Sequence, residues 1–299
     1  MSTTLEEPTV VDASSEAVRR KRVQGSRRAG AFLVLVLGTL LCLFPFYYMV
    51  VGSLQRRPDP RLSGAFPDPT NLTLDNYVGI NESIDLLRTL INSAVFTGGV
   101  IFLTLVLGLL AGYALAVLDF RGRGVLFGAV MLSLVLPFQL LMIPLYVMIV
   151  RTYGLADSYL GMILPFAVNP TAVFIFRQFF RAIPVDLFDA ARIDGGSELQ
   201  VLRYIGIPTA KPAILTAVLV TFIGPWNEFL WPFLITKRAS MQPLAVALAN
   251  FISTVAAAAA NPFGAILAGA TVLAVPAVVL FLLFQKQFTD TNIGSGVKG

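Results

Sequence analysis

The chain has 299 residues, of which 56% are hydrophobic and 13% are charged, and its mean hydropathy is +0.77. A soluble domain carries about 25% charged residues, so this composition indicates an integral membrane protein. The single cysteine, Cys42, excludes an intrachain disulfide, and the absence of histidine excludes a Cys/His metal site and the usual proton shuttle. The net charge of +5 lies largely near the N-terminus, where it reports on membrane topology rather than on nucleic-acid binding.

Residues 1–28 are polar and basic, and we expect them to form a disordered cytoplasmic tail. The basic cluster at 19–28 lies directly before the first apolar run and holds the N-terminus in the cytoplasm. That run, residues 31–51, is longer than the apolar region of about 7–15 residues in a signal peptide. It is therefore predicted to be an uncleaved membrane-spanning helix.

Five further apolar runs are each near the length of about 20 residues that crosses a bilayer as a helix. The six predicted spans are residues 31–51, 87–118, 125–150, 158–180, 212–236 and 263–285. Lysine and arginine are about twice as frequent in the segments that an N-in, C-in arrangement places in the cytoplasm. We therefore predict an all-α membrane protein with a six-helix transmembrane domain over 29–285 and a cytoplasmic C-terminal tail over 286–299.

Small residues and prolines mark irregular points in these spans. Gly108, Gly112 and Ala116 recur at four-residue spacing in the second span, which favours close helix packing. Prolines interrupt the third, fourth and fifth spans next to polar side chains, and Pro276 is expected to break the last span. Broken helices with polar residues near the midplane are typical of a translocation pathway. The candidate pathway-lining residues are Gln139, Asn169, Asn227 and Glu228.

Glu228 is the only carboxylate within the predicted spans, and an ionisable residue there is a functional candidate. It could line the pathway, pair with a partner helix, or lie close to the outer interface. Trp226 and Trp231 favour the interface, because tryptophans concentrate at the boundary between membrane and water.

A polar interlude separates the fourth and fifth spans. Its first part, Val185–Ile193, carries an apolar stripe at helical spacing. The helix is expected to stop at Gly195-Gly196, where the backbone can take a positive φ without a Cβ penalty. A second short helix is predicted to begin at Ser197, with Gln200 completing a capping box, and to end before Pro208.

This interlude resembles the EAA loop in the membrane subunits of ABC importers. The resemblance rests on Asp189-Ala190-Ala191, Asp194-Gly195-Gly196, Ile205 and Pro208. Asp189 stands where the family usually has glutamate, and Gly196 stands where alanine is common. The alternative is an amphipathic loop that lies on the membrane surface.

The resemblance implies that the loop at 184–208 is a cytoplasmic coupling helix that docks in a cleft of an ATPase subunit. It also implies the type I ABC importer permease fold. The residues to which it assigns ATPase coupling are Leu187, Phe188, Asp189, Ala190, Ala191, Arg192, Asp194, Gly195, Gly196 and Pro208. We expect the apolar members near Phe188 to anchor in the cleft, and Asp189 and Arg192 to fix the orientation of the helix.

The likeness extends over most of the chain after the N-terminal tail and points to the carbohydrate-uptake branch of these importers. It rests on Asn92-Ser93, Asp119-Phe120-Arg121, Leu136-Pro137, Arg177-Gln178-Phe179-Phe180, Trp226-Asn227-Glu228-Phe229 and Gln242-Pro243-Leu244. The segment at 294–299 resembles the tail of the MalG-type maltose permease subunit, which reaches toward the ATPase interface. The alanine run at 256–260 is expected to be a connector.

A heteromer follows from this resemblance. It implies a homologous MalF-like second permease subunit, two MalK-like ATP-binding subunits, and an extracytoplasmic solute-binding protein that meets residues 237–251, besides membrane lipids. The chain has no G-x-x-x-x-G-K-[ST] phosphate loop. We therefore expect it to bind no cofactor of its own, with ATP and Mg²⁺ held by the partner subunits.

The expected function is that of a permease subunit forming half of the pathway for a sugar or related polyol across a prokaryotic cell membrane. The main alternative is a stand-alone secondary transporter or channel. Ion-coupled carriers usually keep intramembrane carboxylates or histidines, and Glu228 is the only candidate here. A membrane enzyme is disfavoured, because the spans offer no histidine and no paired carboxylates, and no catalytic residue is expected.

Overall fold

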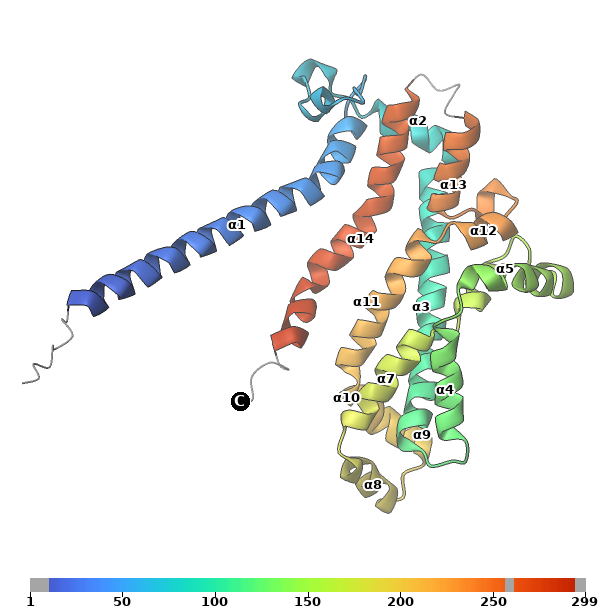
Figure 1. Cartoon of the computed structure of the whole chain (residues 1–299). Helices are drawn as coiled ribbons and strands as arrows, with labels where there is room; N and C mark the ends of the chain where they lie inside the picture. The colour runs from blue at the N-terminus through green and yellow to red at the C-terminus, as the bar shows by residue number, and fades with distance from the viewer. Residues whose placement is uncertain (1–10, 256–260, 294–299) are drawn as a thin grey trace, which may run out of the picture.

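The computed structural model describes residues 11–255 and 261–293. Within these ranges the chain is helical, apart from loops and one isolated β-bridge between Gln55 and Leu72. The all-α prediction is therefore confirmed for the described part of the chain. Figure 1 shows most of the helices in an elongated bundle, with α8 at one end and α2 at the other, whereas α1 diverges from the bundle and α5 lies across it.

The α-helices follow one another in chain order, with short 3₁₀ and π-helical segments between some of them. They are α1 (Val11–Ser53), α2 (Asp75–Ile84), α3 (Leu86–Val117), α4 (Arg123–Ser133), α5 (Phe138–Tyr146), α6 (Tyr159–Ile163), α7 (Pro170–Ala182), α8 (Val185–Ile193), α9 (Glu198–Val201), α10 (Ile207–Thr209), α11 (Lys211–Asn227), α12 (Leu230–Ile235), α13 (Leu244–Asn250) and α14 (Pro262–Ile293).

Three helical stretches are long and apolar enough to cross a membrane without a break, namely Gly30–Ser53, Leu86–Val117 and Pro262–Gln285. Three further helix pairs meet the same criterion together, but they bend by 95°, 50° and 75° at short breaks. The described chain thus has between 3 and 6 candidate spans, depending on whether each bent pair crosses once. The count of six, and the side on which each end lies, remain predictions.

The first helix begins earlier than expected. The sequence predicts a disordered tail up to residue 28, whereas α1 starts at Val11, and the extent of that tail remains a prediction. The segment is rich in arginine, which has high helix propensity, and no proline interrupts it before the apolar run. Residues 1–10 lie outside the described ranges, as do the predicted connector at 256–260 and the tail segment at 294–299.

The last helix is continuous, so the expected break at Pro276 is also wrong. Proline removes a backbone donor, and the freed carbonyl groups in the preceding turn need another partner. The indole Nε1 of Trp226 donates to the carbonyl of Leu273 at 2.9 Å. A neighbouring helix thereby supplies a hydrogen bond to the turn before the proline, next to the Val272 carbonyl that the proline leaves without its helical donor.

The core is divided into separate clusters along the bundle. One surrounds Phe176 and Phe180 between α3, α7, α8 and α11, and a second surrounds Trp231. A third joins Ile80 of α2 to Phe251 and to α14. Because α3 packs against α7, α11, α6, α13 and α2, it runs along nearly the whole height of the bundle.

Glycines allow α3 to approach α7 closely, as the four-residue spacing predicts. A Cβ added to Gly112 would lie 2.4 Å from the Cβ of Phe176, and one added to Gly108 would lie 3.3 Å from the Cβ of Ala172. Real Cβ atoms do not approach other atoms as closely as the first distance, so only glycine fits at position 112. The second span is therefore held tightly against the helix that leads into α8.

Candidate functional site

The polar interlude folds into two short helices joined by a sharp turn, which we call the elbow (185–201). α8 has the bounds predicted from the sequence, Val185–Ile193. Gly195 has a φ of +86°, in the left-handed region that glycine enters without strain. The predicted capping box is present at Ser197, whose backbone N–H donates to Oε1 of Gln200 at 2.8 Å. The turn prediction is confirmed.

Gly196 explains one departure from the family pattern. Its backbone N–H donates to the carbonyl of Ala191 at 2.9 Å, which closes the end of α8. A Cβ at this position would lie 2.8 Å from that carbonyl oxygen. In this chain, alanine would therefore push the turn open.

The second elbow helix does not end before Pro208, which corrects the prediction. It continues through a π-helical segment, Leu202–Gly206, and through α10, and then bends by 75° into α11. Pro208 lies in the first turn of α10, where its missing N–H costs little. The proline thus marks a change of helix type rather than a stop.

Phe188 anchors the elbow to its own bundle. Its side chain is 1% exposed, and its ring centroid lies 6.0 Å from that of Tyr113 on α3. Tyr113 also packs edge-on against Phe180 of α7, with ring centroids 5.5 Å apart. The expectation that Phe188 is an anchor for a partner protein does not fit this geometry, because the ring faces inward.

A chain of polar contacts holds the two elbow helices together and joins them to α3. Arg192 donates from Nη1 to Oδ1 of Asp189 at 2.7 Å and from Nε to Oε1 of Glu198 at 2.8 Å. The hydroxyl of Tyr113 donates to Oε2 of the same glutamate at 2.7 Å. We call this set of four residues the elbow clamp. Asp189 and Arg192 were predicted as site residues, whereas Glu198 and Tyr113 were missed.

Charge stabilises the elbow clamp. The hydrogen bonds from Arg192, and to a lesser degree the one from Tyr113, hold the pKa of the Glu198 carboxyl below its ordinary value, although burial acts in the opposite direction. The same contact with Glu198 raises the pKa of Arg192. Both groups are thus charged at neutral pH, and charge-assisted hydrogen bonds are stronger than neutral ones.

The outer surface of the elbow carries the side chains that a partner could touch. Leu187 is 48% exposed and Ile193 is 85% exposed, and Val185 is exposed beside them. Ala190, Asp194 and Gly195 also lie at the surface, whereas Ala191 and Gly196 are partly buried. Val185 and Ile193 were not singled out in the sequence, although exposed apolar side chains next to a charged cluster are the signal that marks them.

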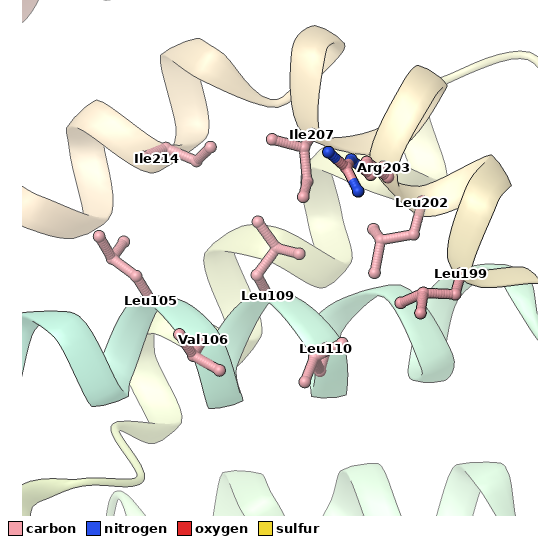
Figure 2. A pocket seen from close by; sticks show the side chains of 9 residues that line it. All are labelled: Leu105, Val106, Leu109, Leu110, Leu199, Leu202, Arg203, Ile207 and Ile214. Carbon is pink, nitrogen blue, oxygen red and sulfur yellow. The ribbon is translucent and has the colours of Figure 1, made fainter.

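An apolar pocket of about 500 Å³ lies beside the elbow, between α3 and the chain from α9 to α11. Figure 2 shows leucines of α3 on one wall, facing Ile207 and Ile214 across the gap. Arg203 is the only charged side chain in the lining, and it sits at the end nearest the elbow. The pocket separates these side chains of α3 from α10, whereas α3 still packs against α11 at Ala213 and Ala217.

Aromatic rings join the breaks in three of the predicted spans. Phe138 begins α5, Phe166 precedes α7, and Trp231 lies in α12. The ring centroid of Phe138 is 4.8 Å from that of Phe166 and 6.2 Å from that of Trp231. The breaks predicted from prolines in the third and fourth spans are confirmed, and the fifth predicted span is interrupted between Asn227 and Leu230.

The four candidate pathway residues lie at these breaks but play local roles. Asn169 caps α7, accepting from the N–H of Thr171 at 2.9 Å, and its amide donates to Thr221 at 3.4 Å. Glu228 accepts from the N–H of Trp231 at 3.1 Å. Asn227 is exposed and bonds to its own helix, and Gln139 is exposed at the start of α5. No hydrogen bond between any two of the four is present in the described part of the chain.

The two tryptophans are buried in the bundle, so they do not support a position of Glu228 at the outer interface, and its depth in the membrane remains a prediction. Trp226 is 5% exposed and Trp231 is fully buried, and each indole N–H donates to a backbone carbonyl of another element. Both rings therefore belong to the core of the bundle. Glu228 is half-buried, and its carboxyl is held by the backbone N–H of Trp231.

The described chain is thus a helical bundle with candidate membrane spans, several of them broken, and a charged two-helix elbow. Residues 104–290 match the family of binding-protein-dependent transport system inner membrane components, and the chain belongs to that family.

Proteins of known role are similar to this chain over almost its full length. The arabinooligosaccharides transport system permease protein AraQ of Bacillus subtilis is 34% identical, covering 91% of this chain and 96% of the relative. The trehalose transport system permease protein SugB of Mycobacterium tuberculosis is 35% identical, covering 92% and 100%. A chain of a bacterial ABC transporter that imports the polysaccharide alginate shares the fold, with a TM-score of 0.77 at 24% identity over 90% of this chain and 97% of that one.

These findings establish a permease subunit of an ABC importer in the inner membrane, which is a transport component and not an enzyme. They decide against a stand-alone transporter. Such a subunit works with another permease subunit, with ATPase subunits and with a solute-binding protein.

Proposed function

We propose that this chain forms half of the translocation pathway for a carbohydrate or related polyol. The observation that carries the proposal is the set of cargoes that the relatives transport. These relatives are similar to this chain over nearly its whole length. They include permeases for arabinooligosaccharides, for trehalose and for sn-glycerol-3-phosphate. These cargoes are rich in hydroxyl groups, and two of the three are carbohydrates.

The partners in the proposed complex are a MalF-like permease subunit and two MalK-like ATPases. The chain spans the membrane six times with both ends in the cytoplasm, and the elbow lies on the cytoplasmic side. The exposed apolar face around Leu187 and Ile193 enters a cleft of the ATPase, with Asp194 at its edge. The loop at 237–251 meets the solute-binding protein on the other side. The excess of lysine and arginine on the elbow side supports this orientation.

The elbow carries movement because it is rigid. Closure of the ATPase subunits pushes on α8, and the elbow clamp passes the displacement to α9 and α3 rather than absorbing it. The broken spans then shift between inward-open and outward-open arrangements around the midplane. Gln139, Asn169, Asn227 and Glu228 line or border the pathway in this proposal, since all four lie at helix breaks.

The test of the coupling role is Gly195→Val in the assembled importer. A β-branched residue at a φ of +86° strains the turn and tilts α8 away from α9. We expect ATP hydrolysis to continue while uptake of the cargo falls at least tenfold, about the change that 1.4 kcal/mol of coupling produces. The measurement compares ATP hydrolysed with cargo accumulated in proteoliposomes.

Gly128→Val is the matched control, because Gly128 is exposed on α4 with open space around it. Its ratio of uptake to hydrolysis should equal that of the unaltered importer. Normal uptake in the Gly195 variant would refute the assignment of the elbow as the coupling element. A panel of sugars, polyols and their phosphates, assayed in the same vesicles, then identifies the cargo.

A further inference from the structure

Side chains bond α3 at both of its ends to segments that lie far apart in the bundle. The helix has 32 residues without a break, whereas the third, fourth and fifth predicted spans are interrupted. Figure 1 shows it running from α13 at one end of the bundle to α9 at the other. At about 1.5 Å per residue, such a helix is about 48 Å long.

At the elbow end, Tyr113 makes the connection. Its ring lies between Phe180 and Phe188, and its hydroxyl donates to Glu198 at 2.7 Å. Since Tyr113 is 4% exposed, it cannot move relative to the elbow without breaking these contacts. The elbow is not next to α3 in the chain, because the chain enters the elbow from α7 and leaves it toward α11. These side-chain contacts therefore connect the elbow to α3 directly.

At the opposite end, polar side chains of α3 hold the backbone that leads into α13. Asn92 donates from Nδ2 to the carbonyls of Ser240 and Gln242 at 3.1 and 2.9 Å. Ser93 accepts at Oγ from the N–H of Leu244 at 2.9 Å. Both α3 side chains are buried, at 2% and 1% exposure, so these bonds are shielded from water.

A further hydrogen bond orients the side-chain amide of Asn92. Tyr159 donates from its hydroxyl to Oδ1 of Asn92 at 2.7 Å, which leaves the amide nitrogen pointing at the two carbonyls. Arg88, one turn earlier, donates from Nε to the carbonyl of Ser240 at 2.8 Å. The segment at 240–244 is therefore tied to α3 by three of its residues.

The distance between the two bonded ends matches the membrane. From Asn92 to Tyr113 the rise is about 32 Å at 1.5 Å per residue, close to the hydrocarbon thickness of about 30 Å. Between them, α3 is packed tightly against α7 at Gly112 but borders the apolar pocket on the side of α11. The helix is thus fixed to α7 and borders open apolar space on the side of α10.

We propose that α3 is a transmission strut that couples the elbow to the segment at 240–244, with Tyr113, Asn92 and Ser93 as its positioning residues. The inference rests on the proposed function, in which the ATPase contacts the elbow and the solute-binding protein contacts 237–251. Movement at either end displaces the other. Because coupling between two sites is reciprocal, loaded binding protein also favours the elbow position in which the ATPases close.

The experiment measures ATP hydrolysis by the complete importer in lipid vesicles, with and without cargo-loaded binding protein. The variants are Tyr113→Phe, which removes one hydroxyl and keeps the ring, Ser93→Ala, and the two together. We expect each single variant to lower the stimulation by binding protein about fivefold, the low end of usual allosteric coupling. Basal hydrolysis should stay unchanged. The double variant should lose no more than either single one, because both changes interrupt one mechanical element.

Two controls match the chemistry of the variants. Tyr204→Phe removes a hydroxyl from an exposed tyrosine close to the elbow, and Ser83→Ala removes one that bonds within α2, to the carbonyl of Gly79. Both should keep full stimulation. Glu198→Gln should keep more stimulation than Glu198→Ala, since an amide oxygen still accepts the bond from Tyr113.

The outcomes separate the strut from the wider proposal. Full stimulation in both single variants, or losses that multiply in the double variant, would overturn the strut while leaving the importer function intact. An unaltered importer that does not respond to any binding protein would instead overturn the proposed function, and the strut with it. Co-purification of each variant with its partner subunits in normal yield shows that assembly is preserved.

Discussion

Two neighbouring apolar residues of α8, Leu187 and Phe188, lie in opposite environments, although both were predicted as anchors for the ATPase. Phe188 is buried against Tyr113, whereas Leu187 points outward and is 48% exposed. A helical stripe identifies which positions are apolar, but the face that meets the chain's own bundle depends on residues far away in the sequence. The two positions therefore offer a clean separation of folding from docking.

We expect Phe188→Ala to destabilise the elbow by about 3–5 kcal/mol, the usual cost of removing a buried phenylalanine ring. Leu187→Ala should leave stability within about 0.5 kcal/mol, because the side chain is half exposed. Thermal unfolding of the purified chain in detergent measures both. If the Leu187 variant retains stability but loses co-purification with the ATPase, docking is assigned to that face. Equal loss of stability in the two variants would contradict the observed burial.

The elbow clamp also predicts a dependence on pH. The folded state lowers the pKa of Glu198 below the ordinary value of 4.5, so the clamp contributes its full stability above that value. The contribution is lost as the pH falls through the lowered folded pKa, where the carboxyl takes up a proton. Because 46% of the Glu198 side chain is exposed, solvent screens the effect and it should be small.

Unfolding followed in detergent should show the melting temperature of the unaltered chain dropping more steeply than that of Glu198→Gln as the medium is acidified below pH 4.5. The glutamine variant cannot titrate at this position and serves as the reference. Parallel curves for the two proteins would mean that the carboxyl is not held by Arg192 in solution.

At the scale of elements, the sequence predicted the features that depend on interactions between residues close together in the chain. The bounds of α8, the glycine turn and the capping box depend on residues within a few positions of one another, and all three are confirmed. The breaks beside Pro137 and Pro170 were predicted for the same reason. The bond between Tyr113 and Glu198 was not, because the two residues are separated by 85 positions and neither belongs to a recognisable pattern.

The packing of α3 on α7 is the element-scale feature with the sharpest steric limit. Gly112→Val would place its Cβ 2.4 Å from the Cβ of Phe176 and 2.9 Å from the backbone nitrogen of Arg177. The helices must separate to relieve this overlap, which should cost about 1–3 kcal/mol. Gly98→Val, on the same helix but with no atom within 4 Å, is the control. The yield and melting temperature of the two variants should differ, and equal values would refute the close approach.

At the scale of the whole molecule, orientation in the membrane is the property that the proposal needs. The chain has one cysteine, so Cys42→Ser gives a background without thiols. A cysteine at exposed Asp186 on the elbow should react with a membrane-impermeant maleimide only after the inner membrane is permeabilised. A cysteine placed at exposed Arg57, near the other end of the bundle, should react without permeabilisation. Reaction at 186 before permeabilisation would reverse the assigned topology.

Two predictions from the sequence failed for the same reason at the scale of the whole molecule. Pro276 was expected to break α14, and the tryptophans were expected at the membrane boundary. Both expectations treat a span as if it stood alone in lipid. In the structure, both tryptophans lie inside the bundle, and Trp226 bonds to the carbonyl of Leu273 in α14.

That single indole bond has a consequence for how the protein could vary over evolution. α14 continues past a proline, and α11 supplies a donor to the turn before that proline. In related chains, loss of the tryptophan should be accompanied by loss of the proline, so the two positions are expected to change together in an alignment of homologues. A substitution of the tryptophan on one helix would then destabilise the proline-containing helix, and the two positions would change together.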